Sequence, residues 1–207
     1  MFSSKLSHEL ALKRMSRYLK QKEDCGLLLK PNSYMCKVDA YPDADFAGMY
    51  GLAELKYPEC VNSRTRFIIM FADFPVLWVS KLQAKTSLST MEAEIIVMDH
   101  CCRELFPIIY ITTSLVKEVV LNMANKKMNV SFHEDNVYAL VLDRTFPPQF
   151  TQSSKYYATK NIGFCEDIVK HRIKFVKFDT VEQLGELFTK GMLISTIGYM
   201  CKKIIGW

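Results

Sequence analysis

Short apolar segments bounded by turn residues, one of them alternating apolar and polar at 128–132, predict five β-strands along the chain. They fall at residues 38–42, 66–71, 76–80, 128–135 and 173–178. The turn Asp73-Phe74-Pro75 joins the second and third strands, which predicts an antiparallel hairpin. Asp43 and Asp45 follow the first strand directly, and because acidic residues are poor strand formers we expect them to end it.

Helical periodicity predicts a first helix from Ser7 to Lys20 and a long second helix that begins at Thr90. Apolar residues of the long helix recur in steps of three and four at 95, 98, 102, 105 and 109, which gives it one apolar face. Pro107 is expected to kink or restart this helix. Weaker helical patterns occupy 137–142, 159–170 and most of 183–207, with an interruption near Gly191.

The order of these elements predicts the fold class. Three strands are followed by a helix, a strand, helical segments, a strand and a last helix. This order is typical of an α/β protein with a five-stranded mixed sheet and helices on both faces. We divide the chain into residues 1–35 with a basic amphipathic helix, a main domain at 36–193 and a C-terminal helical tail at 194–207.

The composition of the chain is typical of a globular protein and not of a membrane protein. The chain has 207 residues, 49% of them hydrophobic and 24% charged, which is typical of a globular domain. It contains no apolar run of the roughly 20 residues that a membrane span needs and no signal-peptide pattern. Seven scattered cysteines favour reduced thiols over a zinc site, so we expect an intracellular protein, cytoplasmic or nuclear and not secreted. The net charge of +5 is compatible with a polyanionic partner but too small to establish one.

Four carboxylates stand at predicted strand and helix ends. They are Asp43, Glu94, Asp135 and Glu186. If the first and fourth strands are adjacent and parallel, their acidic ends meet at one edge of the sheet, the usual place for an α/β active site. Clustered carboxylates need a compensating cation, and hard divalent ions such as Mg²⁺ or Mn²⁺ prefer oxygen ligands. Two such ions activate water for phosphodiester cleavage.

Five ordered motifs resemble the RNase H domain that ends the Pol polyprotein of copia-type LTR retrotransposons. The leading one, Ala11 to Lys20, is similar to the connection between polymerase and RNase H. The other four, called the first to fourth motif below, are Asp43-Ala44-Asp45-Phe46-Ala47-Gly48, Leu77 to Gln83 with Ser89-Thr90-Met91-Glu92-Ala93-Glu94, Glu134-Asp135-Asn136, and Glu182 to Gly191. Together they cover nearly the whole chain, which makes the resemblance specific. It implies an RNase H-like fold and hydrolysis of the RNA strand of RNA/DNA hybrids during reverse transcription.

Carried over motif by motif, the resemblance implies that the catalytic metal ligands are Asp43, Glu94, Asp135 and Glu186, which hold two Mg²⁺ or Mn²⁺ ions. Glu94 is preferred to Glu92 because apolar residues follow it, and Glu92 becomes a supporting residue. Asp45 is a weaker candidate than Asp43, which ends the strand first. A polymerase domain of a parent polyprotein is implied as partner, and we expect this chain to be a truncated and diverged copy.

Three positions depart from the family pattern. Glu186 stands where the family usually has Asp, so metal geometry is expected to suffer without abolishing binding. Tyr156 stands where relatives carry a His, and the high pKa of a phenol prevents proton relay near neutrality. Arg66 stands where a Gly is usual, and an additional phosphate contact is one use for it.

Candidate contacts to the hybrid lie near the motifs: Arg64, Lys81, Gln83, Lys85, Asn136 and Lys155. The basic ones suit phosphates and the amides suit sugars or base edges, although each also suits a solvated surface. Trp78 is expected in the core rather than as a stacking platform. His133 either tunes the metal site or packs within its strand, and the basic first helix either contacts nucleic acid or is solvated.

Two other functions stay open. The first is a catalytically impaired remnant or co-opted domain that binds nucleic acid or protein without cleavage, which Glu186 and Tyr156 favour. The second is an integrase-type transposase of the same superfold, and the order of the motifs argues against it.

Overall fold

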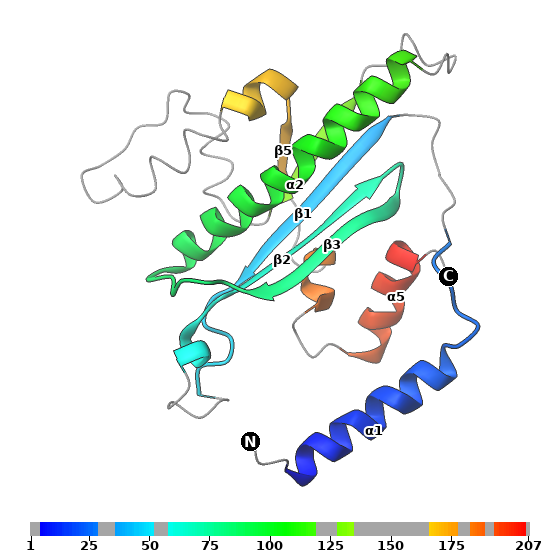
Figure 1. Ribbon diagram of the computed structural model, residues 1–207, viewed down its shortest axis with the longest axis vertical. Helices are drawn as coiled ribbons and strands as arrows, with labels where there is room; N and C mark the ends of the chain where they lie inside the picture. Colours follow the sequence, from blue (N-terminus) through cyan, green and yellow to red (C-terminus); the bar gives the residue numbers. More distant parts are fainter. Residues whose placement is uncertain are drawn as a thin grey trace.

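The computed structural model describes residues 5–28, 36–51, 58–118, 128–134, 166–177, 183–188 and 193–205. Its centre is a five-stranded sheet in the order β3-β2-β1-β4-β5 (Figure 1). The strands are β1 (Lys37–Asp45), β2 (Arg64–Phe71), β3 (Phe74–Leu82), β4 (Asn129–Glu134) and β5 (Lys174–Lys177). The helices include α1 (Leu6–Gln21), α2 (Thr90–Glu118) and α5 (Ile194–Ile205), and residues 166–171 before β5 are helical as well. Short 3₁₀ turns are η1 (Pro58–Val61) and η4 (Leu184–Phe188).

Strand directions in this sheet are mixed. β2 pairs antiparallel with both β1 and β3, whereas β4 pairs parallel with β1 and with β5. The predicted α/β class with a five-stranded mixed sheet is therefore confirmed, and the topology is consistent with an RNase H-like fold. The first and fourth strands are adjacent and parallel, which meets the condition set for the predicted site, so their carboxyl ends lie side by side.

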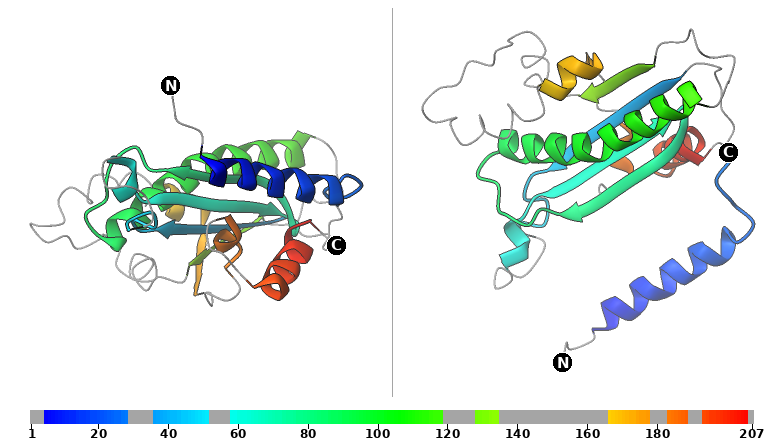
Figure 2. Two further views of the ribbon diagram at one scale, coloured as in Figure 1. Left: turned by 90° about the horizontal axis from the view of Figure 1, so that it is seen from below. Right: turned by 45° about the horizontal axis from the view of Figure 1, so that its top comes forward.

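Helical elements cover both faces of the sheet (Figure 2). On one face, α2 contributes Val97, Cys101 and Leu105 to a core that includes Val38 and Phe132. The opposite face carries a smaller cluster around Ile68, Met70 and Leu184 of η4, against which Ile204 of α5 packs. Since Met200 of α5 is also buried, α5 is a layer of the same fold rather than a separate tail.

The first strand is longer than its sequence predicts. The two aspartates were expected to end it after Pro42, yet β1 continues to Asp45 and pairs with β2 along its whole length. Asp43 faces Arg66 and Asp45 faces Arg64 in this register. Opposite charges directly across an antiparallel pair stabilise it, which offsets the low strand propensity of the aspartates.

Two further boundaries differ from the predicted ones. The hairpin turns at Ala72 and Asp73, both with positive φ, and β3 already begins at Phe74. Two residues with positive φ match the right-handed twist of a two-residue hairpin. The long helix continues through Pro107 instead of restarting, and Leu105 and Ile109 are buried on either side of the proline. Packing on both sides holds the helix together despite the lost hydrogen bond.

The first helix stands apart from the sheet (Figure 1). It begins and ends within one residue of its predicted limits, and none of its residues is buried. Among the described residues, no helix has the length and apolar character needed to cross a membrane. The predicted helix at 137–142 and the predicted loop at 143–154 lie outside the described residues.

Candidate active site at the ends of the central strands

The first predicted ligand, Asp43, is ion-paired with a buried arginine. Arg66 Nη1 lies 2.9 Å from Asp43 Oδ2, and the Arg66 side chain has 0% of its surface exposed. The two residues are register partners on β1 and β2, so the sheet itself brings them together. The suggested phosphate contact of Arg66 is wrong for this structure, because a side chain enclosed to this degree does not reach a ligand at the surface.

Asp45 lies at the edge of the same ion pair. Its Oδ1 atom is 3.8 Å from Arg66 Nη2, and its side chain is more exposed than that of Asp43. The turn after β1 folds back over Asp45, since a Cβ atom at Gly48 would collide with the Asp45 carboxylate. The glycine of the motif Asp-Ala-Asp-Phe-Ala-Gly therefore leaves space for the carboxylate of the second aspartate.

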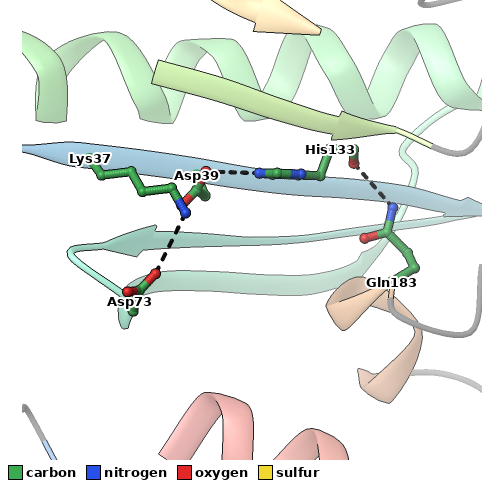
Figure 3. A network of polar contacts seen from close by, with 5 residues as sticks. All are labelled: Lys37, Asp39, Asp73, His133 and Gln183. Carbon is green, nitrogen blue, oxygen red and sulfur yellow. Dashed lines mark hydrogen bonds and ion pairs between the residues drawn. The ribbon is translucent and has the colours of Figure 1, made fainter. Parts of the chain in front are cut away.

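The fourth motif packs directly onto β1 beside Asp43. A Cβ atom at Gly185 would lie 3.1 Å from Asp43 Cβ and 3.2 Å from the Tyr41 carbonyl oxygen, so a glycine allows η4 to approach the strand closely. Gln183 fixes this approach, because its Nε2 donates to the carbonyl oxygen of Pro42 at 3.0 Å. The same atom donates to the carbonyl oxygen of His133 at 3.3 Å (Figure 3). One buried amide thus joins η4 to the ends of both β1 and β4. The sequence contained Gln183 within a motif but gave no sign of this role.

The start of α2 is capped by the sequence Ser89-Thr90-Met91-Glu92. The Glu92 N–H donates to Ser89 Oγ at 3.1 Å, and Glu92 Oε2 accepts the Leu88 N–H at 2.7 Å. The arrangement is a variant of the capping box in which the carboxylate reaches Leu88 instead of Ser89, and it gives Glu92 a structural role. Glu94 lies one half-turn further on, with its Oε2 atom shielded from solvent.

Gln83 also supports the start of α2. Its Nε2 donates to the Ala93 carbonyl oxygen at 3.1 Å, and its Oε1 accepts from Ser87 Oγ at 2.6 Å. The side chain is buried, so a contact with a substrate would require the amide to leave both partners. Its observed role is to connect the end of β3 to the helix that carries Glu94.

The described structure contains only part of the predicted ligand set. Asp43 and Glu94 are described, whereas Asp135 and the side chain of Glu186 lie outside the described residues. The backbone of η4 nevertheless brings position 186 next to Asp43, because Gly185 contacts that aspartate. Among the described side chains, no three His, Cys, Asp or Glu residues lie close enough together to hold a metal ion.

The predicted substrate contacts fall into three groups. Lys81 and Lys85 are exposed and Arg64 is half-buried, all three at the end of β2 and β3 that adjoins the end of β1. Asn136, Lys155 and the variant position Tyr156 lie outside the described residues. Trp78 was expected in the core but is 55% exposed, because β3 is an edge strand and this residue points away from the α2 core.

A buried polar network lies on the same face of the sheet as Asp43. His133 Nε2 is 2.8 Å from Asp39 Oδ1, and the His133 ring stacks on Tyr41 with centroids 4.4 Å apart. Lys37 Nζ lies 2.7 Å from Asp39 Oδ2 and 3.6 Å from Asp73 (Figure 3). Burial acts to raise the pKa of Asp39, but the contacts with His133 and Lys37 outweigh it and hold that pKa below its ordinary value. In this structure His133 therefore packs within the sheet and pairs with Asp39.

Comparison with known proteins finds similarity over most of the chain. No family model matches the sequence. Over 183 residues the chain is 28% identical to the retrovirus-related Pol polyprotein from transposon RE2 of Arabidopsis thaliana. The chain resembles one segment of a transposon polyprotein. The aligned region covers 88% of this chain and 11% of the relative, so the similarity extends across most of the sheet, and the chain spans about a tenth of the relative's length.

The Asp39 network allows a prediction about pH. A depressed carboxyl pKa contributes stability above the unfolded-state pKa, 3.8 for this residue type, and loses it as the pH falls through the folded-state value. Replacing Asp39 by Asn should therefore lower the free energy of unfolding by about 1.5–3 kcal/mol at pH 7, and the difference from wild type should shrink below about pH 4. Urea denaturation at several pH values measures both effects.

Asp73→Asn is the matched control for this prediction. It removes the same charge from the neighbourhood of Lys37, but Asp73 is 39% exposed and its contact is longer. An exposed pair of this kind contributes about 1 kcal/mol or less. Equal losses in the two variants, or a loss for Asp39→Asn that does not change with pH, would contradict the assignment.

Proposed function

We propose that this chain is a retroelement-derived RNase H domain that binds RNA/DNA hybrids and hydrolyses their RNA strand. Its similarity to a transposon Pol polyprotein over most of the chain supports this origin. The observation that carries the proposal is the contact between Gly185 and Asp43, which brings the first and fourth motifs together at the ends of the parallel strands β1 and β4. In α/β sheets, active sites form at such strand ends.

The proposed hybrid-binding surface is the end of the sheet next to Asp43. Lys81 pairs with Thr65 and Thr65 pairs with Ala44, so this lysine is level with the end of β1. Lys85 follows on the exposed segment between β3 and α2. Phosphates of a hybrid would be held by these cations and Arg64, and 2′-hydroxyls would identify the RNA strand. Asn136 and Lys155 remain proposed contacts of the same surface.

Two divalent cations, Mg²⁺ or Mn²⁺, are the proposed cofactors, with Asp43, Glu94, Asp135 and Glu186 as proposed ligands. Carboxylate oxygens suit such ions, which would supply an activated water when bound. The described residues do not fit this set as they stand, because the Asp43 carboxylate is already paired with the buried Arg66 guanidinium. We therefore assign no reaction step to the metal ions.

A second candidate function is hybrid binding without cleavage. The ion pair between Arg66 and Asp43 favours it, since a buried guanidinium competes with a metal ion for the same carboxylate. The surface formed by Arg64, Lys81 and Lys85 needs no metal to bind phosphates. Under either function, the domain's proposed partner is the polymerase domain of a parent polyprotein, and its proposed location is intracellular, cytoplasmic or nuclear.

Binding and cleavage of a labelled RNA/DNA hybrid test these two functions together. The double variant Lys81→Ala/Lys85→Ala should weaken hybrid binding and reduce the dependence of log K on log[salt] by about two units, because two phosphate contacts are lost. Lys170→Ala/Lys174→Ala, here called the β5 lysine pair, is the control, since it removes two exposed lysines near the start of β5, at the opposite end of the parallel strands from Asp43. Cleavage with Mg²⁺ or Mn²⁺ selects the nuclease, whereas binding alone selects the second function.

The proposal fails if the chain binds the hybrid no better than a DNA duplex of the same sequence. The proposal also fails if the Lys81/Lys85 variant and the control with the β5 lysine pair replaced lose the same amount of hybrid affinity. Binding would then depend on the overall charge of the protein and not on the surface next to Asp43.

A further inference from the structure

The cation that compensates Asp43 is part of the protein. Arg66 has 0% of its side chain exposed, and its Nη1 atom lies 2.9 Å from Asp43 Oδ2. Its Nη2 atom lies 3.8 Å from Asp45 Oδ1, so one guanidinium faces both aspartates of the first motif. A buried charge is tolerated only with such compensation. The Arg66 guanidinium therefore reduces the repulsion between these clustered carboxylates.

The fold holds Arg66 in this position from several sides. Its backbone is paired with Asp43 on β1 and with Ser80 on β3, and the next residue on the same face is the buried Ile68. Gly185 of η4 covers Asp43 with no space for a side chain of its own. The guanidinium thus has little room to move away from the carboxylate without local opening of η4 or of the sheet.

A divalent cation held by Asp43 would bind the carboxylate that Arg66 already contacts. Mg²⁺ binds carboxylate oxygens at about 2.0–2.1 Å, and it repels a guanidinium at the same site. We propose that Arg66 is an internal counter-cation of Asp43 that competes with divalent metal ions and so determines the metal affinity of this site. This inference rests on the proposed function, because it takes Asp43 as a metal ligand.

Metal affinity of an Arg66 variant tests the inference without any nucleic acid. Arg66→Met removes the cation and keeps most of the side-chain volume. Mn²⁺ titrated into this variant, followed by calorimetry, should bind at least about tenfold more tightly than to wild type, because one repelling charge near the ion is gone. Adding Asp43→Asn to Arg66→Met should abolish the gain, since the ligand is then missing.

Arg64→Met is the matched control. It removes the same charge from the same strand, two residues away and opposite Asp45. Relative to wild type, the Mn²⁺ affinity of Arg64→Met should rise by less than a third of the rise seen for Arg66→Met. Equal gains in the two arginine variants would mean that net charge alone sets the affinity, and an unchanged affinity in a folded Arg66→Met would mean that Arg66 does not compete. Either result overturns the inference.

A measurement on the wild-type chain covers the case in which Arg66→Met does not fold. The Nε–Hε signal of Arg66 is followed by NMR during a Mg²⁺ titration. Ion binding that shifts this signal, or no ion binding at millimolar Mg²⁺, agrees with competition. Ion binding at Asp43 that leaves the Arg66 signal unchanged overturns it.

The two proposals fail in different ways. If Arg66→Met gains Mn²⁺ affinity but neither chain binds or cleaves a hybrid, the proposed function is wrong and the competition stands. If wild type cleaves hybrids with Mg²⁺ and Arg66→Met gains no affinity, the function stands and the competition is wrong.

Discussion

Replacing Asp43 by alanine is expected to lower the free energy of unfolding by about 3–5 kcal/mol, because the substitution leaves the buried Arg66 guanidinium without its main partner. The ion pair measures 2.9 Å, and both side chains are almost completely enclosed. Asp45 compensates poorly at 3.8 Å from a more exposed position. Urea denaturation of the wild type and of the variant measures the loss.

A double-mutant cycle separates the pair from the strand around it. Asp43→Ala/Arg66→Met removes both charges, so it should be more stable than the sum of the single variants predicts, with a coupling energy of about 1–3 kcal/mol. Asp45→Ala is the matched control and should cost about 1 kcal/mol or less, since its side chain is partly exposed. A cycle that shows no coupling would contradict the structural role of the ion pair.

This prediction also affects how an inactive variant is interpreted. Asp43→Asn is the obvious inactive control for a metal-dependent nuclease. In this protein, however, it also removes the charge that compensates the buried Arg66. Loss of cleavage in this variant would therefore reflect lost stability as well as a lost ligand. A cleavage experiment needs the unfolding curve of each variant measured in the same buffer.

Local patterns in the sequence were sufficient for the arrangement of the sheet. Short apolar runs between turn residues, with alternation at 128–132, predicted all five strands, because these signals arise within a few neighbouring residues. The parallel contact of the first and fourth strands was a condition of the predicted site, and the structure meets it. The first and long helices were predicted in the same way. The site could be predicted only as a set of strand and helix ends.

Features that depend on contacts between distant residues were not predicted. β1 was predicted too short because its aspartates are neutralised by arginines of another strand. A phosphate contact was suggested for Arg66, since nothing in its local sequence distinguishes a buried cation from a solvated one. Gln83 was assigned to the substrate for the same reason, although its amide has partners within the fold.

The second large effect is expected in β4, the strand that leads to the proposed ligand Asp135. Phe132 is fully buried between α2 and β5, and its ring lies 5.5 Å from that of Phe175. Phe132→Ala should destabilise the protein by about 3–5 kcal/mol, because it removes a large core side chain and leaves a cavity. Phe175→Ala on the outer strand should cost about half as much, since Phe175 is only partly buried.

Comparison of these two variants tests which part of the fold holds η4 in place beside Asp43. His133 follows Phe132 directly, and its carbonyl oxygen accepts the bond from Gln183 that holds η4 on the sheet. If the Phe132 core fixes that carbonyl, Phe132→Ala should also speed hydrogen exchange of the η4 amides, whereas Phe175→Ala should leave it nearly unchanged. Equal acceleration in both variants would mean that β5, and not the core beneath β4, positions the fourth motif beside Asp43.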